Sequence, residues 1–315
     1  MEAVPKLVLH IRTEMGKVVV GQEDLKTQCL IALLCQGHAL LEGVPGIAKT
    51  LAVKALSHLL RLDFQRVQCT SDLMPADIIG TNVLNLSSST FQLHPGPVFT
   101  QLLLVDEVNR MPPRTQAALL ECMEERQITI DGTRHDLSPF FTVFATQNPI
   151  DFEGTYPLPE AQLDRFLVKI RVPYPEAKDE IQLLSNVQGG FDSHDLNSAE
   201  LIPIDVELLN TARQEIRTVN VQESLFAYIV QLVRRTREWP ALSLGASPRA
   251  AVSLMVFSKA VAAMDGREYL IPDDIKQSAL PVLRHRIMVK PEADLEGITP
   301  DQVLQDVLRA VEVPR

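Results

Sequence analysis

The stretch EGVPGIAKT, residues 42–50, nearly matches the phosphate-binding pattern G-x-x-x-x-G-K-[ST] and departs from it at one position. Gly43, Lys49 and Thr50 stand where the pattern requires them, whereas Ala48 replaces its second glycine. In such a loop, backbone N–H groups converge on a phosphate, the lysine reaches the β- and γ-phosphates, and the hydroxyl ligates Mg²⁺. Lys49 is therefore a candidate for binding ATP or ADP, and Thr50 for binding magnesium. The alternative is a plain Gly-Pro turn between a strand and a helix.

The alanine need not destroy the loop. Ala48 lies where the chain is expected to enter a helix, and we predict a helical φ there, with the methyl group pointing away from the phosphates. Gly43 and Gly46 give the turn its conformational freedom. The residues predicted to contact the nucleotide are those of the loop and the helix start: Gly43, Val44, Pro45, Gly46, Ile47, Ala48, Lys49, Thr50 and Leu51.

Two adjacent carboxylates, Asp106 and Glu107, follow the apolar run LLLV. Such a run is typical of a strand buried on both faces, and open α/β sheets bind ligands at the carboxyl ends of their strands. We predict that Asp106 holds Mg²⁺ through water and that Glu107 polarises an attacking water, because phosphoryl transfer depends mostly on positioning and charge neutralisation. The alternative is that both acids cap the next helix, expected over 112–125.

An amide follows the third apolar run. Asn148 ends the segment FFTVFATQN, and there its side chain would position the water between the acids and the γ-phosphate. The alternative is an Asx turn before Pro149.

Two arginines are further candidates for catalysis. Arg165, at the start of the fourth apolar run, is either an arginine finger that reaches into a neighbouring subunit or a partner in a surface ion pair with Glu160 or Asp164. Arg249 is the second residue of a helix that begins with a Ser-Pro cap, where a positive charge is unfavourable. A phosphate in front of Arg249 would explain that charge.

The elements around these residues alternate between strands and helices. Apolar runs predict four strands, at 38–43, 101–109, 140–149 and 166–172, and helical spacing predicts a helix over 50–60. Alternation of this kind favours a parallel sheet with helices on both faces. The candidate loop therefore has the strand, turn and helix that it requires.

After residue 176 the strand signals stop and helical patterns follow at 224–237, 247–266 and 273–287. We predict an α/β domain over 1–175 and a smaller helical domain over 176–315. Within the first, the Asp-Gly of QITIDGTRHDL (127–137) predicts a type I′ hairpin. The polar, proline-broken segment 87–99 predicts an exposed excursion.

Composition sets the broad class. Hydrophobic residues make up 46% and charged residues 22%, as in soluble globular proteins, and the net charge of −10 makes nonspecific binding to nucleic acid or anionic lipid unexpected. The chain shows no signal-peptide pattern and no apolar stretch of about 18 residues, so we expect a cytoplasmic protein without a membrane span. The four cysteines are expected to be buried free thiols, and His38 a core residue.

In order, GVPGIAKT, LLLVDEVNR, ATQNP, PEAQLDRF and GASPRAA resemble the motifs of the MoxR family of AAA+ ATPases, from about Val18 to Ile287. The resemblance implies a P-loop AAA+ αβα core whose five-stranded parallel sheet has the order 5-1-4-3-2, a small all-α lid, and a ring that is usually a hexamer. It also implies that Ala48 is a family variant of the Walker A motif.

The same resemblance assigns roles to single residues. Lys49 and Thr50 match Walker A, Asp106 and Glu107 Walker B, and Asn148 sensor 1. Arg165 matches the arginine finger, Arg249 matches sensor 2, and the segment Val19, Val20 and Gly21 matches residues that pack on adenine. The segment at 87–99 resembles an insert in helix 2, and the hairpin at 127–136 an insert before sensor 1. Both would face the pore or a rim of the ring, unless they are inert surface loops.

The resemblance implies chaperone-like work on protein clients, with a von Willebrand factor A domain protein as a partner. Other functions are open at this point: a motor subunit like that of magnesium chelatase, a nucleotide-gated scaffold with little turnover, or a nucleic-acid motor. Chelatase activity with a porphyrin-binding partner would identify the first, and DNA binding the last. The presence of Glu107, Arg165 and Arg249 argues against the scaffold.

Overall fold

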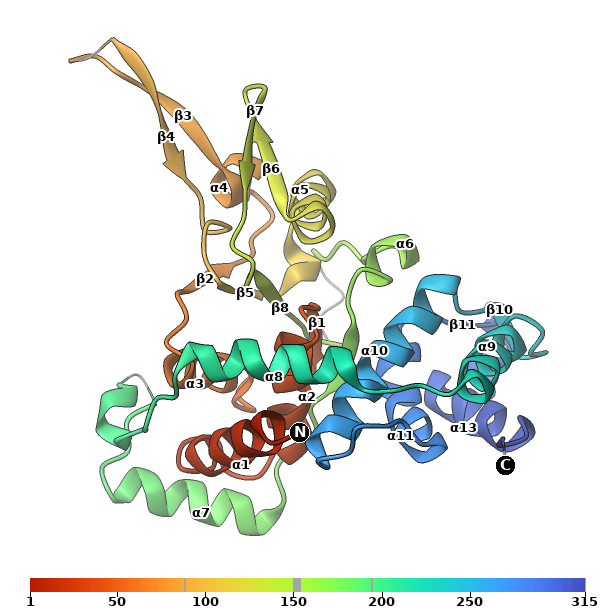
Figure 1. The fold of residues 1–315 in the computed structure, drawn as a ribbon. Helices are drawn as coiled ribbons and strands as arrows, with labels where there is room; N and C mark the ends of the chain where they lie inside the picture. The colour runs from red at the N-terminus through yellow and green to blue at the C-terminus, as the bar shows by residue number, and fades with distance from the viewer. Residues whose placement is uncertain (88, 150–153, 194, 315) are drawn as a thin grey trace.

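Five parallel strands form the centre of the molecule. The computed structural model describes residues 1–87, 89–149, 154–193 and 195–314, and its central strands are β1 (Ala39–Glu42), β2 (Phe64–Gln68), β5 (Leu102–Asp106), β8 (Thr142–Gln147) and β9 (Val168–Arg171). They lie in the order β2-β5-β8-β1-β9 (Figure 1). Numbered along the chain within this sheet, the order is 2-3-4-1-5, which is the predicted 5-1-4-3-2 read from the other edge.

Side chains alternate between the two faces of this sheet. On one face, Leu41, Leu104 and Phe144 pack in a core shared with α1 (Ala3–Gly16), α2 (Glu23–Leu34) and α3 (Lys49–Leu59). On the other, Leu40 and Leu103 pack in a core shared with α5 (Pro113–Glu125). Both faces are buried, which is why the strands read as continuous apolar runs. Truncating a fully buried aromatic such as Phe144 to alanine would cost about 3–5 kcal/mol.

The helices of the second half lie beside this core: α8 (Val206–Thr218), α9 (Glu223–Arg237), α10 (Pro248–Met264), α11 (Pro272–Leu283), α12 (Pro291–Leu295) and α13 (Pro300–Ala310). One short antiparallel pair, β10 (Leu242–Leu244) and β11 (Met288–Val289), lies among them. The predicted cap of α10 is confirmed, because the Ser247 side chain accepts a hydrogen bond from the N–H of Ala250. The longest described helix, α10, has 17 residues, and no described helix is long and apolar enough to cross a membrane.

Two hairpins project from the same side of the core (Figure 1). One consists of β6 (Gln127–Ile130) and β7 (Thr133–Asp136), and its turn residues Asp131 and Gly132 have φ values of +49° and +80°, as a type I′ turn requires. The predicted hairpin is therefore confirmed.

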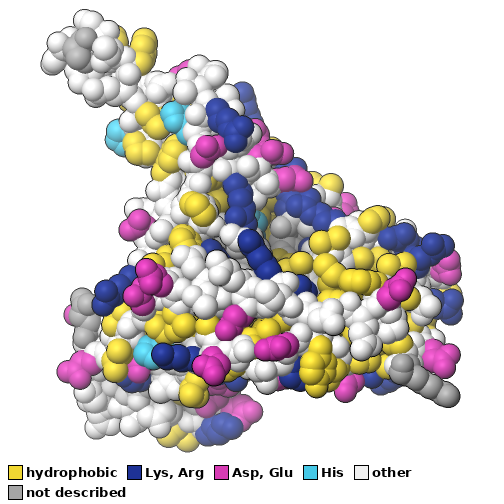
Figure 2. Space-filling view, viewed as in Figure 1, with side chains coloured by type: hydrophobic (Ala, Val, Ile, Leu, Met, Phe, Trp, Pro, Cys, Tyr) yellow, Lys and Arg dark blue, Asp and Glu magenta, His cyan; other side chains and the backbone are white. Residues whose placement is uncertain are grey.

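The other hairpin shows the form that the exposed excursion predicted over 87–99 takes. It begins earlier, at Gly80, and pairs β3 (Gly80–Asn85) with β4 (Thr90–Pro95) in an antiparallel ribbon. The pairing of these two strands could not be predicted from the sequence. Most side chains of the ribbon are exposed, so its strands lack an alternating apolar pattern. The ribbon forms an arm that extends away from the body of the molecule (Figure 2). Leu86 and Phe91 are among its exposed apolar side chains.

Candidate nucleotide-binding site

The loop between β1 and α3 bends at two glycines. A Cβ atom on Gly43 would lie 2.6 Å from the carbonyl oxygen of Val172, so a larger residue there would force a shift of the backbone. Gly46 has a φ of +83°, which glycine adopts without strain. The two glycines predicted to shape the turn thus stand where the backbone requires them.

The predicted helical φ of Ala48 is wrong. This residue immediately precedes α3 and has φ +65° and ψ +17°, in the left-handed region. That conformation costs an L-residue with a Cβ atom roughly 1–2 kcal/mol, which explains why the general pattern has glycine at this position. The loop accommodates the methyl group through backbone strain.

The amino-terminal end of α3 is open to an anion. Its N-cap residue, Ala48, makes no side-chain cap, and its first turn contains no acidic residue, so these residues leave the positive end of the helix available to an anion. The Nζ atom of Lys49 donates to the carbonyl oxygen of Val44 at 3.1 Å and also to that of Gly43, so the ammonium group lies inside the turn. Burial lowers the pKa of Lys49, and nearby carboxylates, first of all Asp106 and Glu107, oppose that effect.

Thr146 in β8 holds both predicted acids. Its hydroxyl donates to Asp106 Oδ1 at 3.0 Å and accepts from the N–H of Glu107 at 2.9 Å. Glu107 has a φ of +59°, so the chain turns sharply as it leaves β5. The two acids do not cap α5, whose N-cap residue is Pro112 and has no side-chain hydrogen bond. This alternative interpretation is therefore wrong.

Each acid also contacts an arginine. Arg66 Nε lies 2.7 Å from Asp106 Oδ2, and Arg110 Nε lies 3.0 Å from Glu107 Oε2. Both arginine side chains are about half exposed, at 51% and 45%, so these ion pairs are weak enough to exchange for a cation or a water. The acids are oriented by their neighbours and remain free to take other partners.

Asn148 lies where it was predicted to lie. It directly follows β8, which is the strand between β5 and β1, so it sits at the same edge of the sheet as the acids and the loop. Its side chain is buried, and the neighbouring Gln147 carbonyl accepts from the N–H of Gly43 at 3.3 Å. The loop, Asn148 and both acids therefore share one edge.

The segment predicted to pack on adenine follows α1. Val19 is buried, and Gly21 has a φ of +62°. A Cβ atom on Gly21 would collide with the carboxylate of Asp179 in α7 (Ala177–Gln188). Gln22 Nε2 donates to the carbonyl of Pro173 at 2.8 Å, which ties this segment to the chain between β9 and α7. Val20 lies between the two, and the adenine contact stays a prediction.

Arg165 and Arg249 do not join the other predicted residues. Both contact Glu124 at the end of α5: Arg165 Nε lies 2.8 Å from Glu124 Oε2, and Arg249 Nη1 lies 3.0 Å from Oε1. Among the described residues, Arg165 forms no ion pair with Glu160 or Asp164, so that alternative is wrong. A phosphate bound in this subunit's own loop does not explain Arg249 in this conformation.

His38 and the cysteines are structural. His38 Nδ1 accepts from the N–H of Val143 at 2.9 Å, so Nε2 donates to the Met123 carbonyl at 3.0 Å. Burial lowers the pKa of His38 to about 4. The four cysteines are free thiols; three are buried and Cys35 is partly exposed. The described residues contain no group of three or more His, Cys, Asp or Glu placed to hold a metal ion.

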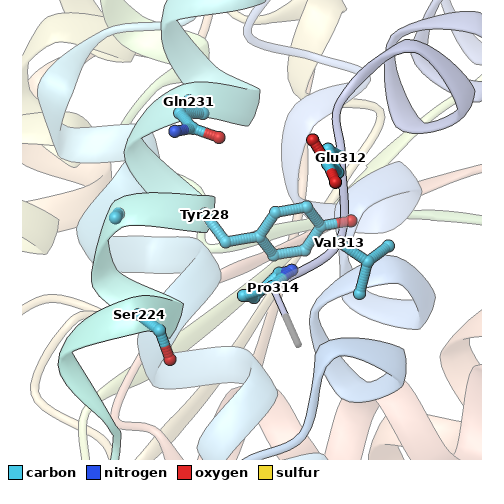
Figure 3. A pocket seen from close by; sticks show the side chains of 7 residues that line it. Ser224, Tyr228, Gln231, Glu312, Val313 and Pro314 are labelled. Carbon is cyan, nitrogen blue, oxygen red and sulfur yellow. The ribbon is translucent and has the colours of Figure 1, made fainter.

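A separate pocket lies between α9 and the chain after α13 (Figure 3). It has a volume of about 320 Å³, and the buried hydroxyl of Tyr228 has no hydrogen-bond partner within the described part of the chain. Its lining contains none of the predicted site residues, so it is not the candidate site.

Sequence reasoning missed Thr146, Arg66, Arg110 and Glu124. Thr146 had a signal, because it lies two residues before Asn148 and side chains two apart on a strand share a face. No signal in the sequence pointed to Arg66. It lies in β2, and its contact with Asp106 depends on the pairing of β2 with β5 in the folded sheet.

The strand order, the phosphate-binding loop after the first strand and the acids after the third define a P-loop protein of the AAA+ class with a helical lid. Residues 38–168 match the family model described as ATPase family associated with various cellular activities, and residues 234–307 match the AAA lid domain.

Similar proteins cover nearly the whole chain. The uncharacterized protein YeaC of Bacillus subtilis is 43% identical over 98% of this chain and 94% of its own length. Chaperone MoxR1 of Mycobacterium tuberculosis is 40% identical over 96% of this chain and 81% of its own length. The crystal structure of a candidate ATPase from Cytophaga hutchinsonii is 42% identical and has a TM-score of 0.88, over 98% of this chain and 94% of that one. The chain belongs to the MoxR family of AAA+ ATPases.

Proposed function

We propose that this chain hydrolyses ATP with Mg²⁺ as part of a ring, and that it couples hydrolysis to the remodelling or activation of protein clients in the cytoplasm. The supporting observation is the convergence of an ammonium group, two carboxylates and an uncapped helix N-terminus at one sheet edge. A free phosphate would be repelled by the carboxylates of Asp106 and Glu107. A phosphate that binds together with a divalent cation avoids this repulsion. The cation would be attracted by the two carboxylates, and the phosphate by the ammonium group and the helix N-terminus.

The roles of the residues follow from this arrangement. Lys49 and the loop N–H groups hold the β- and γ-phosphates, and the segment 19–21 packs on adenine. Thr50 and Asp106 are the residues that would hold magnesium, which neutralises phosphate charge when bound. Glu107 polarises the attacking water and takes up its proton, while Asn148 positions it. The water oxygen bonds to the terminal phosphorus as the bond to the departing ADP oxygen breaks.

A second copy of the chain completes the site. Arg165 and Arg249 lie with Glu124, away from this subunit's loop, so they are available to a neighbour. In a hexameric ring each subunit would supply Arg165 to the nucleotide of the next. The name of the relative MoxR1 supports a chaperone role by similarity. A von Willebrand factor A domain protein is the partner we propose for client selection.

The test of the shared site mixes two inactive variants. Glu107→Gln and Arg165→Ala should each bind ATP and hydrolyse it slowly. Mixed rings contain some interfaces that join an intact Glu107 to an intact Arg165, and turnover should return there. If mixed assemblies form and turnover stays absent, the shared site is wrong.

Client coupling needs its own experiment. The Glu107→Gln protein held with ATP should retain clients that the wild-type protein releases after hydrolysis. Capture with ATP that disappears with ADP supports the chaperone role, whereas equal capture with both nucleotides contradicts it.

A further inference from the structure

One carboxylate joins the two displaced arginines. Glu124 Oε2 lies 2.8 Å from Arg165 Nε, and Oε1 lies 3.0 Å from Arg249 Nη1. The three residues come from the end of α5, the segment just before β9 and the first turn of α10. Three elements that are distant in sequence therefore converge on a single side chain.

This cluster lies at the amino-terminal end of β1, opposite the phosphate-binding loop. His38, which precedes β1, contacts the Met123 carbonyl beside Glu124 and accepts a hydrogen bond at its own carbonyl from Leu167 at 2.8 Å. The four residues of β1 separate this end from the loop by about 13 Å, at about 3.3 Å per residue. Neither arginine serves its own subunit's loop in this conformation.

The backbone around the arginines is fixed independently of Glu124. Asp164 accepts from Ser247 Oγ at 3.0 Å and from Arg286 Nε at 2.7 Å. Arg286 is buried and also donates to the Phe166 carbonyl at 2.6 Å. The neighbours of Arg165 and Arg249 in the chain are thereby held together, so Glu124 acts on the two side chains alone.

Glu124 leaves most of the guanidinium donors free. Arg165 uses only Nε and Arg249 only Nη1, and the described residues provide no further partner for either. The side chains are 27% and 46% exposed, so the ion pairs themselves contribute little to stability. The Glu124 carboxylate offsets the repulsion between the two guanidinium groups and sets the distance between them. The remaining donors suit one further anion with several oxygens.

We propose that Glu124 is a positioning residue that holds Arg165 and Arg249 as one pair for the terminal phosphate of ATP bound by a second copy of the chain. This inference rests on the proposed function. The phosphate can bind without displacing Glu124, because it uses donors that Glu124 leaves free.

The first test compares Glu124→Gln with Glu125→Gln, a change of the same kind at the next residue, whose carboxylate forms no ion pair in the described part of the chain. The Glu124 variant should lose about tenfold to a hundredfold in kcat, since misplaced catalytic groups cost about that much, while its KM for ATP stays unchanged. The Glu125 variant should match the wild type. An equal loss in both variants, or an unchanged kcat in the Glu124 variant, overturns the proposal.

The second test asks in which subunit Glu124 acts. Mixed with Glu107→Gln, the Glu124→Gln protein should recover turnover, because its own acids meet an intact arginine pair from the other variant. Mixed with Arg165→Ala, it should recover none beyond its own residual rate, because both variants are defective on the same side of the interface. The reverse pattern would place Glu124 in its own subunit's site and overturn the proposal. Failure of Glu107→Gln with Arg165→Ala to recover would instead identify the shared site as the error.

Discussion

At the scale of single residues, Ala48 carries backbone strain in the candidate phosphate-binding loop. Its φ is +65°, and its methyl side chain offers neither a charge nor a hydrogen-bonding group to a phosphate. A change at this position should therefore alter stability more than affinity.

Ala48→Gly should raise the free energy of unfolding by up to about 1 kcal/mol, because relief of about 1–2 kcal/mol of strain is partly offset by the greater chain entropy of glycine. Affinity for ATP should change by less than about tenfold, or about 1.4 kcal/mol. Urea denaturation and titration calorimetry measure both. Ala52→Gly, inside α3, is the control and should destabilise by about 1 kcal/mol or more. Equal losses in the two variants would contradict a strained Ala48.

Lys49→Ala should abolish ATP binding and leave the fold intact. The ammonium lies inside the turn against the carbonyls of Gly43 and Val44, and its charge is the main counterpart of the phosphates. Calorimetry with ATP and Mg²⁺ measures the loss. Lys54→Ala, further along the same helix, is the control and should bind normally. Unchanged affinity in the Lys49 variant would remove the loop from the nucleotide site.

At the scale of elements, helices, strands and turns that depend on local sequence patterns could be predicted, whereas contacts that depend on how separate elements pack could not. The four apolar runs, the Asp-Gly hairpin and the Ser-Pro cap of α10 were predictable because each depends on residues close in sequence. The ribbon of β3 and β4 was not, since its strands pair only with each other and bury little. The loop, both acids and Asn148 lie at the ends of the strands where the sequence predicted them, although the backbone of Ala48 differs from its prediction. The joining of Arg165 and Arg249 by Glu124 required three elements to be placed first.

His38 links three elements and gives the fold a pH dependence. It precedes β1, donates from Nε2 to the end of α5 and accepts at Nδ1 from β8, and the Nδ1 contact requires the neutral imidazole. Its pKa is lowered from 6.5 to about 4 in the folded chain by burial. Between these pH values the unfolded chain binds the proton and the folded chain does not. Stability is therefore complete above pH 6.5 and falls as the pH drops towards 4.

Substitution of His38 isolates this contribution. From pH 7 to pH 4 the wild type should lose about 3 kcal/mol more stability than His38→Gln, as a shift of about 2.5 pKa units implies. The glutamine side chain can still accept and donate but does not titrate, and His285, which is also buried, is present in both proteins. Urea denaturation at a series of pH values measures the difference. Parallel stability curves for the two proteins would exclude His38 as the source.

At the scale of the whole molecule, the two halves of the proposed chemistry lie at opposite ends of the sheet. The loop, the acids and Asn148 share the carboxyl edge, and Arg165 and Arg249 lie near the amino end of β1. The proposed ring would resolve this separation, because each subunit would present one of these two regions to the neighbour on either side. In that arrangement a single subunit would bind ATP but would lack the arginines at its own site.

The specific ATPase activity should therefore rise with protein concentration and reach a plateau, while the affinity for ATP stays constant. An arginine supplied by a neighbour is worth about 10³–10⁵ in rate in the GTPase precedent, so the dilute protein should be nearly inactive. Turnover measured over a dilution series, together with sedimentation at the same concentrations, checks the prediction. Arg165→Ala is the control, because it should stay slow at every concentration even where it assembles. A constant specific activity from monomer to assembly would mean that one subunit holds a complete site, and the placement of both arginines in the neighbour's site would then be wrong.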